Sequence, residues 1–134
     1  MDAPDRIATE FNRLLELGHE RVPELPSAEQ IVWYVVVARC EKDMNGFESV
    51  FEQGLTSPEL AFLIESLRNL DEENLAEEFA LVFKLLQQEH FYDYRNCNML
   101  SETAKEQIAA IGGRVGDRLW DFDEKLVALL DSAV

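Results

Sequence analysis

The sequence predicts an all-α fold, a single domain (1–134) built as a bundle of about six helices. Residues typical of helix N-termini open four of the segments, at Ser27, Ser57, Asp71 and Ser101. Apolar residues within the segments recur every three or four positions, which is the spacing of one helix face. A chain of 134 residues is also long enough to bury one substantial core.

The first predicted helix begins near Pro4, and apolar residues such as Ile7 and Phe11 follow at helical spacing. Gly18 is expected to end it, because glycine readily adopts the backbone conformations that follow a helix. The stretch 19–26 contains two prolines, which lack the amide hydrogen that a helix uses, so we expect a connector there.

The next segment, QIVWYVVVARCEKDM (30–44), could be read in two ways. Its β-branched residues suit a strand, and Asn45-Gly46 is a strong hairpin signal. A capping box formed by Ser27 and Gln30 favours a helix, and the segment is too long for a typical strand. We therefore expect a central helix, buried on all sides and ended by Asn45-Gly46.

The rest of the chain continues in the helical pattern, with one interruption. The stretch 89–99 is aromatic and polar without a period, which indicates a loop. The remaining predicted helices are a short one holding Phe47 and Phe51 that ends at Gly54, and longer ones over 57–70, 72–86, 101–113 and 119–130.

The composition is strongly acidic, with 27 acidic and 12 basic residues and a net charge of −15. Such a charge disfavours direct binding to nucleic acid or to anionic membranes and favours basic partners. The longest apolar run, residues 31–38, is far too short to cross a bilayer. The N-terminus has no signal-peptide pattern, so we expect a cytoplasmic protein.

The sequence holds no assembled catalytic or metal-binding motif. His19 and His90 are isolated, and no zinc-ligand spacing is present. Two cysteines make no disulfide framework, and Cys40 falls within the central helix, where we expect a buried thiol. We therefore expect a protein that is not an enzyme and that uses neither a metal nor a cofactor.

The most distinctive feature is an excess of acids in the middle of the chain. Residues 71–78 hold five acids and no base, and residues 46–100 hold eleven acids against three bases. Acids four positions apart on a helix, such as Glu73 and Glu77, should repel each other. Rigid carboxylates a few ångströms apart resemble the spacing of DNA phosphates. The candidate partner-binding residues are Glu48, Glu52, Asp71, Glu72, Glu73, Glu77 and Glu78, with a secondary group of Asp121, Asp123 and Glu124.

The stretch EQIVWYVVVARCEKDMNGFESVFEQG (29–54) resembles the signature of a bacterial family of small all-helical acidic proteins, the DNA-mimic family. In that family an apolar helix with a Trp-Tyr-type pair leads into an Asn-Gly-Gly-Phe motif. The resemblance covers about 27–130 and implies a non-catalytic binding protein that forms a dimer. The residues corresponding to the motif here are Trp33, Tyr34, Asn45, Gly46, Phe47 and Phe51.

Three functions remain open at this stage. The first is an acidic interaction protein that occupies the basic surface of a DNA-binding protein. The second is a small enzyme or ligand-binding protein that uses the Asn45 region and the loop from Tyr92 to Cys97. The third is a structural homodimer whose acidity serves only to keep it in solution.

Overall fold

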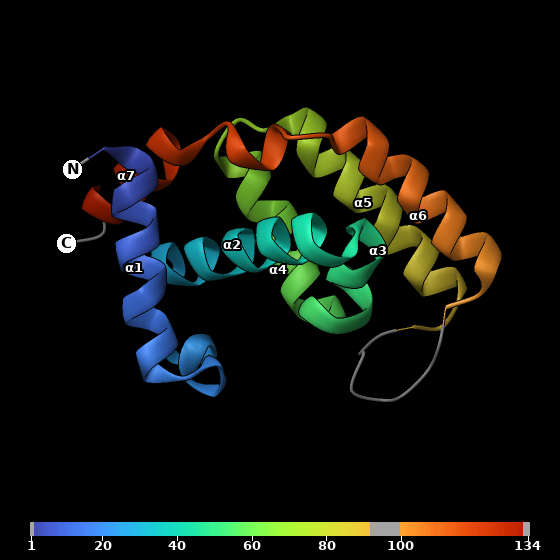
Figure 1. Ribbon diagram of the computed structural model, residues 1–134, viewed down its shortest axis with the longest axis horizontal. Helices are drawn as coiled ribbons and strands as arrows, with labels where there is room; N and C mark the ends of the chain where they lie inside the picture. Colours follow the sequence, from blue (N-terminus) through green and yellow to red (C-terminus); the bar gives the residue numbers. More distant parts are fainter. Residues whose placement is uncertain (1, 92–99, 133–134) are drawn as a thin grey trace.

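The computed structural model describes residues 2–91 and 100–132 (Figure 1). The described part contains no strand and six α-helices of ten or more residues, which confirms the predicted all-α fold. These helices are α1 (Ala3–Leu17), α2 (Ser27–Asn45), α4 (Ser57–Asn69), α5 (Glu73–Gln88), α6 (Glu102–Val115) and α7 (Asp123–Ser132). Shorter elements lie between them: the 3₁₀ helices η1 (His19–Glu24) and η4 (Arg118–Trp120), the single turn α3 (Phe47–Ser49) and the π-helical turn η2 (Val50–Gly54).

Helix α2 runs through the middle of the molecule (Figure 1). It contacts α1 and α7 near one end, and α3, η2 and α4 along the rest of its length, while α5 packs between α4 and α6. Between Ile31 and Arg39 its side chains are buried on nearly all sides, with Val32, Val35 and Ala38 fully enclosed. The prediction of a central buried helix is therefore confirmed, and packing decides the conformation of a segment whose β-branched residues alone would suit a strand.

Asn45-Gly46 ends α2 and does not form a hairpin turn. Helix α2 extends to Asn45, and Gly46 has a φ of 98°, a conformation that residues with a side chain rarely adopt. The Gly46 amide donates to the carbonyl of Lys42, which closes the last turn. The chain then turns directly into α3 and η2, whose residues Phe47 and Phe51 are buried as predicted.

Phe47, Phe51 and Phe79 form an aromatic cluster that joins α3 and η2 to α5. Their rings meet edge to face, with centroids 5.0 to 6.0 Å apart. Helix α6 approaches this cluster at Gly112, where a Cβ atom would lie 2.6 Å from the Cβ of Phe47. The missing side chain is thus what allows α6 to pack so closely on α3.

This contact also explains one error in the sequence-based boundaries. The glycines at 112 and 113 were expected to end the helix that starts after Ser101, but α6 continues to Val115. Gly112 is used for close packing inside the helix, and the true end is at Gly116, which has a φ of 53°.

Three of the four predicted helix caps are wrong, and two of these are at Ser27 and Asp71. Ser27 makes no capping hydrogen bond, because α2 begins after Pro26 and the Gln30 side chain donates to the carbonyls of Pro23 and Leu25. Asp71 lies in a turn with a φ of 60°, and α5 starts two residues later without a side-chain cap.

The other helix starts and stops agree closely with the prediction. Ser101 accepts from the amide of Ala104, as a cap should, and Gly18 follows the end of α1. Helix α4 starts at Ser57 as predicted, but the cap predicted there is the third that is wrong, because the capping box consists of Thr56 and Glu59. The expected connector 19–26 contains the 3₁₀ helix η1 with Pro23 inside it.

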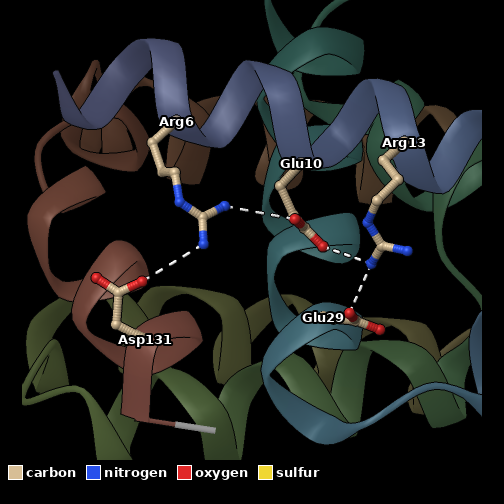
Figure 2. A network of polar contacts seen from close by, with 5 residues as sticks. All are labelled: Arg6, Glu10, Arg13, Glu29 and Asp131. Carbon is tan, nitrogen blue, oxygen red and sulfur yellow. Dashed lines mark hydrogen bonds and ion pairs between the residues drawn. The ribbon is translucent and has the colours of Figure 1, made fainter. Parts of the chain in front are cut away.

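Ion pairs tie α1 to both α2 and α7 (Figure 2). Glu10 of α1 is 9% exposed and lies between Arg6 and Arg13 of the same helix. Arg13 also pairs with Glu29 of α2, and Arg6 with Asp131 of α7. The buried Glu10 carboxylate is thus shared by two arginines that each reach a second helix.

No helix in the described ranges is both long and apolar enough to cross a membrane. The predicted loop over 89–99 falls largely on residues 92–99, outside the described part of the chain.

Candidate functional site

The acidic stretch 71–78 forms the turn before α5 and the first part of that helix. Three of its five acids pair with bases from other elements. Glu72 contacts Lys125 of α7 at 2.9 Å, Glu73 contacts Arg68 of α4 at 3.5 Å, and Glu78 contacts Arg114 of α6 at 2.9 Å. These carboxylates therefore have partners within the protein and hold α5 against its neighbours.

The surroundings of this stretch also contain bases. A hollow of about 570 Å³ on the outer side of α5 is lined by Glu77 and Glu78 together with Arg68, Lys84 and Arg118. Asp71 and Glu77 form no ion pair within the described ranges, yet Glu77 still shares the hollow with three cations. The structure thus gives residues 71–78 a mixed electrostatic environment, although the only charged residues within the stretch itself are acids.

The acids near the end of α2 have a different environment. Glu48 lies on α3 and Glu52 on η2, both are half-buried, and neither forms an ion pair with a described base. Glu41 is occupied by local contacts, because it accepts from the amide of Asn45 and from the hydroxyl of Ser49. We refer to residues 41–54 as the α2–η2 corner.

The α2–η2 corner also exposes an apolar side chain. Met44 is 79% exposed, and it lies beside Asp43, an exposed acid without an ion pair among the described residues. Phe47 and Phe51 are buried beneath the same corner and fix its backbone against the core. The corner therefore combines uncompensated carboxylates and one exposed apolar side chain on a rigid support.

The secondary group of acids is divided by the structure. Asp123 pairs with Arg39 of α2 at 2.6 Å, while Asp121 and Glu124 are exposed. Arg39 is only 1% exposed, and it also donates to the carbonyl of Leu119. Asp123 therefore acts within the fold, as the counter-ion of a buried cation.

Arg39 is a residue that the sequence reasoning missed. Its guanidinium lies 4.9 Å from the ring centre of Trp120 and 5.5 Å from that of Phe122. Burial lowers the pKa of Arg39, and the nearby Asp123 carboxylate opposes that change. The available signal was a single cation directly after the apolar run of α2, a position that a central helix would bury.

Most residues of the family-like motif support the core. Trp33, Tyr34, Phe47 and Phe51 are buried, and Gly46 forms the turn after α2. Asn45 is exposed, and its side-chain contact is with Glu41.

The expectation of a buried Cys40 thiol is wrong. Cys40 is exposed, since it projects from the last part of α2 after the most enclosed stretch has ended. The remaining desolvation raises the pKa of its thiol, with Asp43 adding to the effect, so the thiolate is disfavoured. The loop from Tyr92 to Cys97, which the alternative ligand-binding function used, lies outside the described residues.

The described side chains contain no group of three or more histidine, cysteine, aspartate or glutamate residues that could hold a metal ion. No protein-family model, no curated protein and no solved structure matches this chain. The resemblance to the DNA-mimic family therefore rests on sequence motifs and remains a prediction.

Proposed function

We propose that this protein is a non-catalytic acidic interaction protein that binds a basic protein partner, and that the α2–η2 corner is the main contact surface. The observation that carries the proposal is that Glu48 and Glu52 have no base partner among the described residues, whereas the acids at 72, 73 and 78 do. Carboxylates without an internal partner are the ones that remain available to a partner's lysines and arginines.

The distribution of the bases supports this proposal. Eight of the eleven lysines and arginines in the described part pair with a carboxylate of the same chain. Most basic side chains are thus neutralised within the protein. The net charge of −15 therefore comes from carboxylates that have no basic partner among the described residues. A surface of that sign attracts basic proteins over distances of about a Debye length, ~8–10 Å at physiological salt.

A DNA-binding protein is the partner class that we favour. Glu48 and Glu52 lie four positions apart on consecutive helical turns, and side chains at this spacing stand about 5–6 Å apart. That separation is on the scale of the phosphates that a DNA-binding surface contacts. Because α3 and η2 are anchored by buried phenylalanines, little conformational entropy is lost when these carboxylates are engaged.

The test is a pull-down from lysate at low and at high salt, followed by affinity measurements with the basic protein that is captured. A Glu48→Gln, Glu52→Gln double variant should lose several-fold in affinity and should show a weaker dependence on salt. The matched control is Glu72→Gln, Glu73→Gln, which also removes two charges but from acids that already have internal partners.

Two results would contradict the proposal. If the control variant loses more affinity than the corner variant, the contact surface is the start of α5 and the corner is solvated surface. If no basic protein is retained even at low salt, the interaction function fails. Gel filtration of the pure protein tests the remaining alternative, a homodimer in which the acids have no binding role.

A further inference from the structure

A pocket of about 540 Å³ lies between η1, the first half of α2 and the start of α4. Its size is within the ~300–1,000 Å³ range of small-molecule sites. Its lining contains no lysine or arginine, in contrast to the hollow beside α5, and includes Glu20, Gln30, Tyr34, Glu59 and Phe62. The pocket shares no lining residue with the α2–η2 corner.

Tyr34 is the residue that marks this pocket as a site. It is 4% exposed, and it has no hydrogen-bond partner in the described part of the chain. Tyr34 lines the pocket, and its hydroxyl is not among the fully enclosed atoms without a partner. Burial, together with the charge of Glu59, raises the pKa of Tyr34 to about 12, which keeps the hydroxyl protonated at neutral pH. A buried hydroxyl without a partner is costly unless a ligand or water satisfies it.

His19 also lines the pocket at its exposed rim, where it pairs with Glu20 at 3.4 Å, and most of the other hydrogen-bonding groups around the pocket are acceptors. The Gln30 amide nitrogen already donates to Pro23 and Leu25, which leaves its carbonyl oxygen as the free group. The Thr56 hydroxyl already donates to Glu59. Pro23 and Pro58, which also line the pocket, carry no amide hydrogen.

The start of α4 would ordinarily attract an anion, but here the amides of Thr56 and Glu59 are already used by the capping box. Glu59 accepts from the backbone amide of Thr56, and the capping box also uses the backbone amide of Glu59 itself. Glu59 adds a negative charge at the same position, so the helix end presents a carboxylate to the pocket. The chemistry of the pocket therefore favours a cation with several N–H donors.

Aromatic side chains complete the lining. The rings of Tyr34 and Phe62 meet edge to face, with centroids 5.7 Å apart, and both border the pocket. Aromatic faces attract organic cations and also accommodate the apolar part of such a ligand. We propose that this pocket binds a small organic ammonium compound, with Glu59 as its counter-ion and with Gln30 and Tyr34 as its hydrogen-bond partners.

The test compares three probes of similar shape and different charge: 2-phenylethylammonium, 2-phenylethanol and 3-phenylpropionate. Binding to the full chain is measured by NMR titration at about 0.15 M salt, where non-specific attraction to the acidic surface is screened. The ammonium compound should bind at one site with a Kd below about 1 mM, and the neutral and anionic probes should bind at least tenfold more weakly.

Three variants locate the binding. Glu59→Gln keeps an oxygen for the capping box but removes the charge, and it should weaken ammonium binding about tenfold. Tyr34→Phe removes only the hydroxyl and should weaken it about three- to tenfold. Glu65→Gln is the matched control, because Glu65 is exposed on the same helix, forms no ion pair with a described residue and lies outside the pocket.

An Nα-acetyl-lysine N-methylamide probe distinguishes a free amine from a lysine side chain of a partner as the source of the ammonium group. Equal or tighter binding of this probe, with the same dependence on Glu59, would assign the pocket to a partner's lysine. The proposal is overturned if the neutral or anionic probe binds as well as the ammonium compound. It is also overturned if no saturable binding occurs, or if neither Glu59→Gln nor Tyr34→Phe differs from Glu65→Gln.

Discussion

The α2–η2 corner and the start of α5 are both rich in acids, yet the fold uses their carboxylates differently. At the start of α5, bases from α4, α6 and α7 pair with Glu73, Glu78 and Glu72. At the corner, Glu48 and Glu52 meet no described base. The number of acids in a segment therefore does not tell how much negative charge is available to a partner.

The two regions are also held in place by different forces. The corner is positioned by apolar contacts, above all those of Phe47 and Phe51, so we expect Glu48 and Glu52 to contribute little to stability. The start of α5 is held partly by ion pairs, so its acids contribute to stability. Four substitutions test this contrast, in order of decreasing effect on the free energy of unfolding.

The largest effect is expected for Phe51→Ala, which removes the apolar anchor of the corner. Phe51 is fully buried, so the change should lower the free energy of unfolding by about 3–5 kcal/mol in a denaturant titration. Leu81→Ala is the control, since Leu81 is 47% exposed, and it should cost less than about 1 kcal/mol. A small loss at Phe51 would mean that apolar packing does not hold the corner.

The next effect concerns the contact between α6 and the corner. Gly112→Ala places a methyl group 2.6 Å from the Cβ of Phe47, so it should lower the free energy of unfolding by about 1–3 kcal/mol. Gly113→Ala is a matched control one residue away, where nothing lies within 4 Å of the new methyl group. That change should stabilise the protein by up to about 1 kcal/mol, because alanine favours helix. If both substitutions changed the free energy of unfolding equally, the contact between α6 and Phe47 would not be tight.

A smaller effect is expected at the start of α5. The triple variant Glu72→Gln, Glu73→Gln, Glu78→Gln breaks three ion pairs, each worth about 0–1 kcal/mol, and should destabilise the protein by about 0.5–2 kcal/mol. Repulsion between Glu73 and Glu77 alone would predict the opposite sign. Thermal unfolding at low and at high salt distinguishes the two, because the loss from broken ion pairs should shrink as salt is added.

The smallest effect is expected for Glu48→Gln, Glu52→Gln at the corner. Neither residue pairs with a described base, so stability should change by less than about 0.5 kcal/mol, with a slight gain as repulsion is relieved. The same denaturant titration measures it. A loss above about 1 kcal/mol would show that these acids support the fold, and the contrast between the two regions would disappear.

Most of the helices could be predicted from the sequence because their signals are local. The positions of Gly18 and Gly46, the spacing of Phe47 and Phe51, and the cap at Ser101 each act within a few residues of the chain. The cap at Ser27 was predicted wrongly because the preceding Pro26 shifts the start of α2 by one residue.

The electrostatics of the two acidic regions could not be predicted in the same way. The partners of Glu72 and Glu78 are Lys125 and Arg114, which are distant in sequence and become neighbours only in the folded chain. The ammonium pocket is likewise assembled from η1, α2 and α4, so no single segment carries its pattern. The composition predicts the sign of the total charge. The tertiary structure decides which carboxylates are paired within the protein and which can bind a partner.

The pairing of Arg6 with Asp131 has a topological consequence. It joins the first helix to the last, and α1 and α7 pack together at one side of the molecule (Figure 1). The backbone is thus close to forming a ring, and a short glycine-rich linker between the two ends would close it at little cost in chain entropy. A circularly permuted chain with new ends elsewhere would keep every helix and would turn the α1–α7 contact from a distant one into a local one.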